Sequence, residues 1–247
     1  MSVFQTLLGQ LDNQSANHLV LIDPDRKNDG RIDGLVASVN ESGADAILVG
    51  GSLIMDGGFQ DRVMAIKTAA KVPVILFPGS ATQLSKHADA VLFMSLLSGR
   101  NPQYLIGEQV QAAPLLKNLG LEVIPTGYLL MAGGEPTAVE FMSNSQPLPA
   151  KKPDIALAHA LAAQYLGMAL VYLEAGSGAA TAVPDEIIRR LAAEVEIPLA
   201  VGGGIRTPEE AAAKVKAGAR FIVTGSIFES DSGPDTMANI ATAVHEA

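Results

Sequence analysis

The sequence predicts a (β/α)8 barrel of the TIM type that takes up the whole chain, residues 1–247, as a single domain. Eight short apolar runs typical of buried strands alternate with segments of helical spacing, and no shift in composition marks a linker. Barrels of about this length are common. Hydrophobic residues make up 48% and aromatic residues only 4%, which is typical of parallel strands covered by helices. An open, doubly wound sheet of eight strands stays as the structural alternative.

The predicted strands are short apolar segments, and glycine, proline or aspartate ends most of them. They span residues 18–23, 45–50, 72–77, 90–94, 121–125 and 169–173, and two more begin near Pro198 and Arg220. In a barrel all strands end on one face, and the active sites of this fold lie on that face. The residues that directly follow the strands are therefore the first candidates for function.

Segments with helical spacing lie between these strands. They span residues 30–42, 59–70, 104–119, 154–167, 184–195 and 235–246, and another helix begins near Thr207. One inserted segment, at about residues 126–152, breaks the alternation; it is rich in Pro and Gly but carries apolar side chains such as Tyr128 and Phe141. Loops of this length are usually functional or disordered, and the apolar content favours an ordered cover over an apolar groove.

The composition excludes several classes of function. The formal net charge is −9, with 17 basic and 26 acidic residues, so the chain is not expected to bind nucleic acid. There is no cysteine, which excludes disulfides, thiolate catalysis and zinc–sulfur sites. No apolar run reaches about 18 residues and the N-terminal residues do not resemble a signal peptide. We therefore expect a cytoplasmic protein that is not an integral membrane protein.

The strongest motif signal is a set of three strands near the C-terminus that end in glycines. Their ends read YLEAGSG (residues 172–178), VGGGIR (residues 201–206) and VTGS (residues 223–226). Barrels frequently bind phosphate between the loops after strands 7 and 8 and a helix N-terminus, where backbone N–H groups face the anion. The pattern therefore predicts a phosphate site. The alternative is a set of tight turns that need positive φ.

Glu174 and Tyr172 are the candidates for acid–base chemistry. Glu174 follows the sixth strand, where a carboxylate can reach a ligand hydroxyl at the barrel mouth and act as a general base. Tyr172 alternates with apolar neighbours along the same strand, so it points either to the ligand or into the core. The alternatives are a solvated loop carboxylate and a core tyrosine. The four histidines share no metal-ligand spacing, and we assign them no role.

Carboxylates at the end of the first strand indicate a Mg²⁺ site. Asp23 and Asp25 lie in the sequence LIDPDRK, with Lys27 nearby, and Ser52 follows the second strand. Mg²⁺ is commonly held by one or two carboxylates together with substrate phosphates, and Ser52 can add a hydroxyl to the same ion. The alternative is turn chemistry, which applies to Asp25 more than to Asp23 because Asp23 directly follows a buried strand. Ser52 can equally be a helix-cap or turn serine.

These residues lie within longer blocks by which the chain closely resembles the geranylgeranylglyceryl phosphate synthases, prenyltransferases related to the heptaprenylglyceryl phosphate synthases. The matching blocks fall in order along almost the whole chain: LIDPD, GGS (residues 50–52), ILFPG, ADAVLFMSLLSGRNP, KPDIA, YLEAGSGA, VGGGIR and VTGS. The combination of YLEAGSG, GGGIR and TGS is specific. ILFPG and FMSLLSGRNP resemble the second sequence group of the family, which occurs in some archaea and in certain bacteria.

The resemblance implies a reaction and a set of site residues. In this family sn-glycerol 1-phosphate attacks C1 of a prenyl diphosphate, here geranylgeranyl diphosphate, and forms an ether with release of diphosphate; Mg²⁺ is required. By position, Asp23 and Ser52 hold Mg²⁺, and Glu174 takes the proton from the 3-hydroxyl. The implied glycerol phosphate residues are Tyr172, Leu173, Glu174, Ala175, Gly176, Ser177, Gly178, Gly203, Gly204, Gly225 and Ser226. The product is a membrane lipid precursor, and the family implies a homo-oligomer, either a dimer or a hexamer.

Two other classes of protein fit the same glycines. A barrel isomerase or aldolase that acts on a small sugar phosphate would need an essential Lys or Asp at a strand end and a small polar pocket. The apolar segment and the pair Asp23 and Ser52 speak against this alternative. A non-catalytic phosphate-binding barrel would not need Glu174. Residues 129–145 lie in a variable region of the family, so the preference for a twenty-carbon tail comes from the group resemblance alone.

Overall fold

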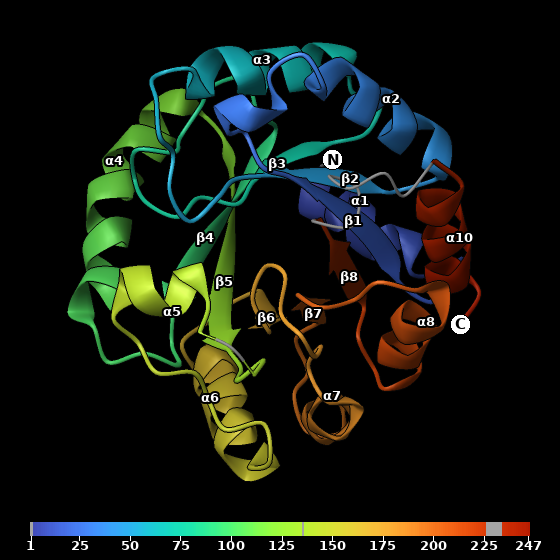
Figure 1. The fold of residues 1–247 in the computed structure, drawn as a ribbon. Helices are drawn as coiled ribbons and strands as arrows, with labels where there is room; N and C mark the ends of the chain where they lie inside the picture. Colours follow the sequence, from blue (N-terminus) through green and yellow to red (C-terminus); the bar gives the residue numbers. More distant parts are fainter. Residues whose placement is uncertain (1, 135, 226–233) are drawn as a thin grey trace.

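Eight parallel strands close into a barrel in the computed structural model, in the order β1 to β8 with β8 paired to β1 (Figure 1). The open sheet considered as an alternative is therefore wrong. The structure describes residues 2–134, 136–225 and 234–247. The strands are β1 (Asn17–Ile22), β2 (Ala46–Val49), β3 (Val74–Leu76), β4 (Ala90–Leu96), β5 (Glu122–Leu130), β6 (Leu170–Glu174), β7 (Leu199–Gly202) and β8 (Phe221–Thr224).

Helices surround the barrel and connect successive strands (Figure 1). They are α1 (Val3–Gln10), the 3₁₀ turn η1 (Arg26–Asn28), α2 (Ile32–Ser42), α3 (Phe59–Ala69), the π-helix η2 (Gln103–Gly107), α4 (Glu108–Leu119), α5 (Ala138–Ser143), α6 (Pro153–Tyr165), α7 (Asp185–Ala192), α8 (Pro208–Lys216) and α10 (Pro234–His245). Of these, α1, η1 and α5 were not predicted, and the helix predicted over residues 104–119 begins with a π-helical turn. In the described residues, no helix has both the length and the apolar character that a membrane crossing needs.

The strand predicted over residues 121–125 continues in the structure to Leu130. Pro125 does not end it, because Pro125 pairs with Phe93 of β4 and the ladder to β6 begins at the next residue, Thr126. The first part of the inserted segment is thus a buried barrel strand. The later part carries α5, whose N-cap Thr137 accepts a hydrogen bond from the backbone N–H of Glu140 at 3.2 Å.

The core has two layers because strand side chains alternate between the two faces of the barrel wall. Side chains that point outward pack with the helices, as Val49 and Leu173 do. Side chains that point inward fill the barrel together with Leu7 of α1, as Leu48 and Tyr172 do. This division decides which residues of a strand end can reach a ligand.

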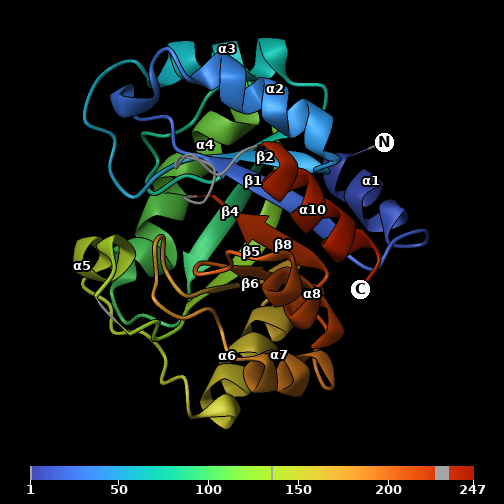
Figure 2. The ribbon, with the colours of Figure 1, turned by 45° about the vertical axis from the view of Figure 1, so that its right-hand side comes forward.

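Helix α1 closes the amino-terminal end of the barrel. Leu7 is buried in the inner layer, and the ring of Phe4 stacks on that of Phe221 with centroids 6.0 Å apart. The Asn17 side chain donates to the Leu7 carbonyl at 2.9 Å and ties the helix to β1. Figure 2 shows α1 at one end of the barrel and α5 at the opposite end, so the open mouth lies at the carboxyl ends of the strands.

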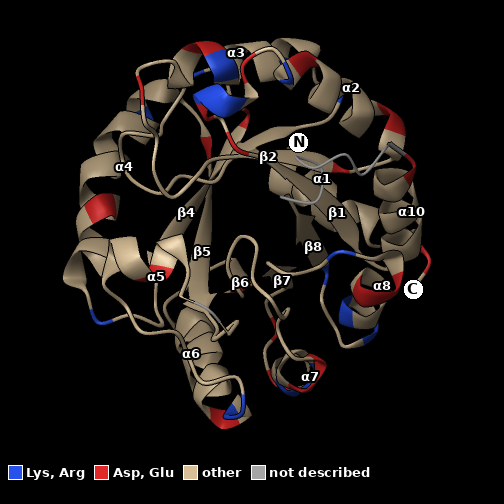
Figure 3. Cartoon of the chain, in the orientation of Figure 1, with Lys and Arg blue, Asp and Glu red and all other residues tan. Residues whose placement is uncertain are grey.

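Charged residues lie mainly on the outer helices and connecting loops, and Figure 3 shows basic and acidic residues side by side around η1 and the start of α3. The acidic excess of the chain is therefore not concentrated on the strands themselves. The mouth is built by the loops after the strands, and the arrangement of those loops determines the site.

Candidate functional site

A cavity of about 430 Å³ opens at the carboxyl ends of the strands. One part is polar and lies over the barrel axis, where Asp23, Ser52 and Glu174 line it together with glycines of the last three strand ends. The other part is apolar and runs between β4, α4 and α5. One continuous space thus adjoins carboxylates, glycine-rich backbone and an apolar groove.

Glu174 is the last residue of β6 and is only 6% exposed. Its Oε1 accepts a hydrogen bond from the Gly176 backbone N–H at 2.6 Å. Burial raises the pKa of this carboxyl to about 7, against the opposing effects of the Gly176 N–H and the Tyr172 hydroxyl. The structure contradicts the alternative of a solvated loop carboxylate. A buried carboxyl with a pKa near neutrality, facing a cavity, is suited to move a proton.

Three stacked aromatic rings lie beside Glu174. The Tyr172 ring stacks on Phe77 at 5.1 Å and on Tyr128 at 5.4 Å between centroids. The Tyr172 hydroxyl lies beside the Glu174 carboxylate, but it makes no hydrogen bond of normal geometry with a described residue. Burial and the nearby carboxylate raise the pKa of Tyr172 well above its usual range, so the hydroxyl stays protonated. Tyr172 is both a core residue and a residue that lines the cavity.

The glycines after β7 are required by close packing. A Cβ at Gly203 would lie 2.4 Å from Glu174 Oε1 and 2.7 Å from the Gly176 nitrogen, and Gly203 has a φ of +82°. A Cβ at Gly204 would lie 2.8 Å from the backbone nitrogen of Ala182. The loops after β6 and β7 therefore meet backbone to backbone. This arrangement presents main-chain groups to the cavity at Gly178, Gly203 and Gly204, which suits an anion such as phosphate.

The opposite side of the polar region is built from side chains. The Asp23 carboxylate lies directly against the second strand end, because a Cβ at Gly51 would come within 2.9 Å of Asp23 Oδ1. Lys27 Nζ is 3.3 Å from Asp23 Oδ2, and Ser52 follows Gly51 in the cavity wall. Asp25 instead caps η1 by accepting from the Lys27 backbone N–H at 3.0 Å, as turn chemistry predicts.

These residues fit a Mg²⁺ ion that is held mainly by a substrate. One carboxylate and one hydroxyl, from Asp23 and Ser52, are hard oxygen donors of the kind that Mg²⁺ takes, with phosphate oxygens and water as its other ligands. Within residues 2–134, 136–225 and 234–247, no three acidic or histidine side chains form a metal-binding group. At such an ion Asp23 and Ser52 would supply two ligands, and a bound phosphate and water would supply the others.

Gln83 is a buried residue beside the site that sequence reasoning missed. It is 4% exposed, its Nε2 donates to the Gly51 carbonyl at 2.8 Å, and its Oε1 accepts from the Gly79 N–H at 3.2 Å. It thus joins the loops after β2 and β3 next to Ser52. No local signal marks it, because its partners are backbone atoms and one of them, the Gly51 carbonyl, is 32 residues away.

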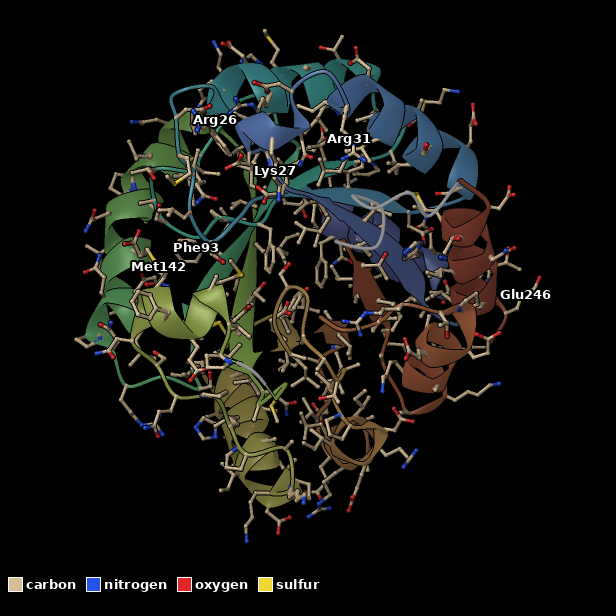
Figure 4. The ribbon with its side chains drawn as sticks, viewed as in Figure 1. Arg26, Lys27, Arg31, Phe93, Met142 and Glu246 are labelled. Atoms are coloured by element: carbon tan, nitrogen blue, oxygen red, sulfur yellow. The ribbon has the colours of Figure 1, made fainter. Side chains whose placement is uncertain are left out.

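The sequence predicted an apolar groove but not the residues that line it. Its lining residues come from the loop after β3, from β4, from α4 and its π-helical start, and from α5: Phe77, Leu84, Val91, Phe93, Met94, Leu96, Tyr104, Ala112, Leu116, Val139 and Met142. The Tyr104 hydroxyl donates to the Met142 carbonyl at 3.1 Å and holds α5 over the groove. Figure 4 shows Phe93 and Met142 on the side that α5 covers, and Lys27 above the strand ends.

The structure gathers most of the predicted site residues around one cavity. The predicted residues that line it are Asp23, Ser52, Tyr172, Glu174, Ser177, Gly178, Gly203, Gly204 and Gly225. Leu173 and Ala175 pack instead in the outer core layer, and Gly176 acts through its N–H to Glu174. Ser226 lies outside the described residues. His18, to which no role was assigned, is buried and its Nε2 lies 2.7 Å from Thr224 Oγ1, next to Gly225.

Comparisons with known proteins agree on one family. A profile of the PcrB family matches residues 11–244. The geranylgeranylglyceryl phosphate synthase of Chitinophaga pinensis is 46% identical over 92% of this chain and 90% of its own, and that of Thermococcus kodakarensis is 50% identical over 86% and 84%. The crystal structure of the Thermoplasma acidophilum synthase in complex with sn-glycerol 1-phosphate superposes with a TM-score of 0.94 at 38% identity, over 100% of both chains.

Proposed function

Because this chain belongs to the PcrB family, we propose that it joins the 3-hydroxyl of sn-glycerol 1-phosphate to C1 of geranylgeranyl diphosphate in a Mg²⁺-dependent reaction. The chain is a prenyltransferase of the geranylgeranylglyceryl phosphate synthase type. The finer proposal concerns the donor, the metal and the roles of single residues. One observation carries it: a single cavity joins a buried carboxyl to glycine backbone on one side and to an apolar groove on the other.

Glu174 is the proposed general base. Its carboxylate takes the proton of the 3-hydroxyl, the oxygen forms a bond to C1 of the prenyl group, and the bond from C1 to the diphosphate oxygen breaks with its electron pair. The pKa of about 7 supports this role, because the carboxyl is both substantially ionised and basic near neutral pH. The Gly176 N–H fixes Oε1, which leaves Oε2 on the side of Tyr172 and Gly202.

Backbone groups of the last three strand ends are the proposed phosphate ligands. Gly178, Gly203, Gly204 and Gly225 line the polar region near Glu174. Helix α8 begins at Pro208 behind these glycines with a complete capping box between Thr207 and Glu210. A phosphate held there would place a three-carbon alcohol against Glu174. This assignment uses no basic side chain, which agrees with the acidic composition of the chain.

Asp23 and Ser52 are the proposed protein ligands of Mg²⁺, on the other side of the polar region. When bound, the ion would neutralise charge that develops on the leaving diphosphate. Asp23 also lies 3.3 Å from Lys27, whose ammonium adds a positive charge at the mouth. These groups bind and orient the diphosphate so that C1 points to the nucleophile.

The apolar groove is the proposed site of the prenyl tail. It begins at Phe77 and Phe93 near the polar region and continues to Ala112 and Leu116 on α4. Burial of an isoprenoid chain is favourable in proportion to the apolar area that it removes from water, by about 25 cal/mol per Å². The groove therefore supports a long-chain donor and disfavours a small sugar phosphate, for which this apolar space would be empty.

Self-association belongs to the same proposal. Large apolar side chains are exposed on η2 and α4, at Ile106 and Val110, and at the end of α6, at Tyr165 and Leu166. Exposed apolar groups of this kind are typical of subunit contacts. We expect sedimentation to detect a dimer or a hexamer, and a monomer at all concentrations would contradict this part.

A turnover assay tests the function directly. The purified protein is mixed with sn-glycerol 1-phosphate, Mg²⁺ and radiolabelled prenyl diphosphates of several lengths, and with sn-glycerol 3-phosphate as the control. We expect a phosphatase-releasable prenyl ether from the 1-phosphate alone, with the twenty-carbon donor preferred. A folded protein that binds phosphate and forms no ether with any donor would contradict the proposal, and the sugar-phosphate barrel would then replace it.

A further inference from the structure

Arg62, in the first turn of α3, makes an unusually complete set of hydrogen bonds. The residue is 7% exposed. Nε and Nη2 donate to the two Asp29 oxygens at 2.6 and 3.0 Å, and Nη1 and Nη2 donate to the two Asp56 oxygens at 2.6 and 2.8 Å. Nη1 also donates to the Pro24 carbonyl at 3.2 Å. All the N–H donors of one guanidinium are therefore used.

The partners of Arg62 belong to two different loops of the barrel mouth. Pro24 and Asp29 lie in the loop between β1 and α2, whereas Asp56 lies in the loop between β2 and α3. The first loop carries Asp23, which directly precedes the bonded Pro24 carbonyl, and the second carries Ser52. The Asn28 side chain adds a bond to the Asp23 carbonyl at 2.8 Å. Arg62 thus connects the backbone segments that place two proposed Mg²⁺ ligands.

The geometry needs an arginine and a neighbouring glycine. A lysine has no planar fork and cannot donate to two carboxylates and a carbonyl at once. Gly58 leaves room for the guanidinium, because a Cβ there would lie 2.9 Å from Arg62 Cζ. Hydrogen bonds from Arg62 hold the pKa of Asp29 and of Asp56 below the usual range, so both carboxylates stay ionised. The cluster lies outside the residues that line the cavity.

We propose that Arg62 is a positioning residue for the metal–diphosphate end of the site, which it holds in shape by joining the loops after β1 and β2. This inference rests on the proposed function. Arg62 touches neither substrate; it acts through the backbone at Pro24 and through Asp56. Its loss therefore changes the placement of Asp23 and Ser52 and leaves the glycerol phosphate end unchanged.

Arg206 offers a matched comparison on the opposite side of the mouth. Its Nη2 donates to the Ala179 carbonyl at 2.6 Å, and its guanidinium also reaches the carbonyls of Gly178 and Gly204 at 3.4 and 3.3 Å. It therefore joins the loops after β6 and β7, which are the proposed phosphate loops. Replacement of either arginine by lysine keeps the charge and removes the fork. Arg62 is buried and bonded to two carboxylates, whereas Arg206 is exposed and bonds to carbonyls, so the comparison uses which probe each variant weakens and not the size of the effect.

The test measures binding by calorimetry, with Mg²⁺ plus inorganic diphosphate as one probe and sn-glycerol 1-phosphate as the other. For Arg62→Lys we expect the affinity for Mg²⁺ and diphosphate to fall about tenfold, as for groups that orient metal ligands, with glycerol phosphate affinity within about twofold of wild type. Gly58→Ala displaces the guanidinium without removing it, and we expect the same pattern with a smaller fall. Arg206→Lys should give the opposite pattern.

The outcomes separate this inference from the proposed function. Equal weakening of both probes in Arg62→Lys, or a lower melting temperature with unchanged affinity for both, would mean a purely structural role and overturn the inference. A wild-type protein that forms the ether while Arg62→Lys binds Mg²⁺ and diphosphate normally overturns the inference alone. A wild-type protein that binds both probes but forms no ether overturns the proposed function, while the two binding patterns still decide the role of Arg62.

Discussion

The two halves of the barrel mouth differ in the groups that they present to the cavity. After β1, β2 and β3, side chains hold the loops: Arg62, Gln83 and Asn28 bond to backbone carbonyls, and Asp23 and Ser52 face the cavity. After β6 and β7, the loops meet backbone to backbone at glycines with positive φ, and Arg206 bonds to their carbonyls from outside. Side-chain oxygens suit a cation, whereas main-chain N–H groups suit an anion. In the proposed reaction, one face would bind both substrates because the groups suited to a cation and those suited to an anion lie on different sides of it.

Glu174 lies between these halves, and its replacement should have the largest effect. We expect Glu174→Gln to lower kcat by about 10²- to 10⁴-fold, the usual contribution of a positioned general base. Calorimetry should still show sn-glycerol 1-phosphate binding, because the amide oxygen can accept from the Gly176 N–H as the carboxylate does. Turnover at the wild-type rate would exclude Glu174 as the base, and loss of binding would move it to the phosphate half.

The pH dependence of kcat/KM offers a second measurement on the same residue. The base works when ionised and its pKa in the free protein is raised to about 7, so kcat/KM should rise with pH to a plateau, with a midpoint near 7. A profile that is flat between pH 5.5 and 8 would contradict the assignment.

The same pKa predicts an effect on stability. The folded-state pKa lies above the unfolded value, so the folded protein binds more protons between about pH 4.5 and 7, and the free energy of unfolding falls as pH rises through that window. At pH 8 the buried charge lowers the free energy of unfolding by on the order of 3 kcal/mol. Glu174→Gln carries no charge there, so this variant should melt several degrees above wild type at pH 8. The difference should nearly vanish at pH 4.5, and an equal difference at both pH values would contradict the burial argument.

The next largest effect should come from the backbone half. Gly203→Ala places a Cβ 2.4 Å from Glu174 Oε1 and forces a non-glycine residue to a φ of +82°, so we expect glycerol phosphate affinity to fall about 10- to 100-fold. Gly178→Ala is the matched control, because its φ of +72° carries the same strain but no atom lies within 4 Å of the new Cβ. If both variants lose the same affinity, backbone strain alone is responsible and the close approach of the loops is unimportant.

The smallest effect should come from the side-chain half. Asp23→Asn keeps the shape of the side chain but removes its charge, and we expect the Mg²⁺ concentration for half-maximal activity to rise about tenfold. Ser52→Ala should raise it less, because a hydroxyl is a neutral ligand. If Asp23→Asn lowers kcat at saturating Mg²⁺ as strongly as Glu174→Gln does, the two halves of the mouth do not have the separate roles described here.

The sequence predicted the barrel because strand and helix signals alternate locally. Two departures have physical causes. Pro125 resembles a strand end, but the missing N–H is tolerated because the pairing to β6 starts at Thr126. Helix α1 is short, and its stability comes from Leu7 and Phe4 packing into the end of the barrel, which a local pattern does not show.

The candidate site was predictable where chemistry is concentrated in a short motif, as at Glu174 and Gly203. It was not predictable where a residue acts through distant partners. Arg62 and Asp29 are far apart in the sequence, and Gln83 bonds to backbone atoms that carry no sequence signal. Leu173 lies within the same motif as Glu174, but strand alternation turns it toward the helices.

The placement of the tyrosines has a practical result. The chain has four tyrosines and no tryptophan, so its near-ultraviolet spectrum comes mainly from tyrosine. Tyr104, Tyr128 and Tyr172 line the cavity, and Tyr165 is 80% exposed. Difference absorbance and near-ultraviolet circular dichroism therefore report mainly on the tyrosines of the cavity. Substrate titrations of the unlabelled protein can be followed by these two signals, without a dye or a tag.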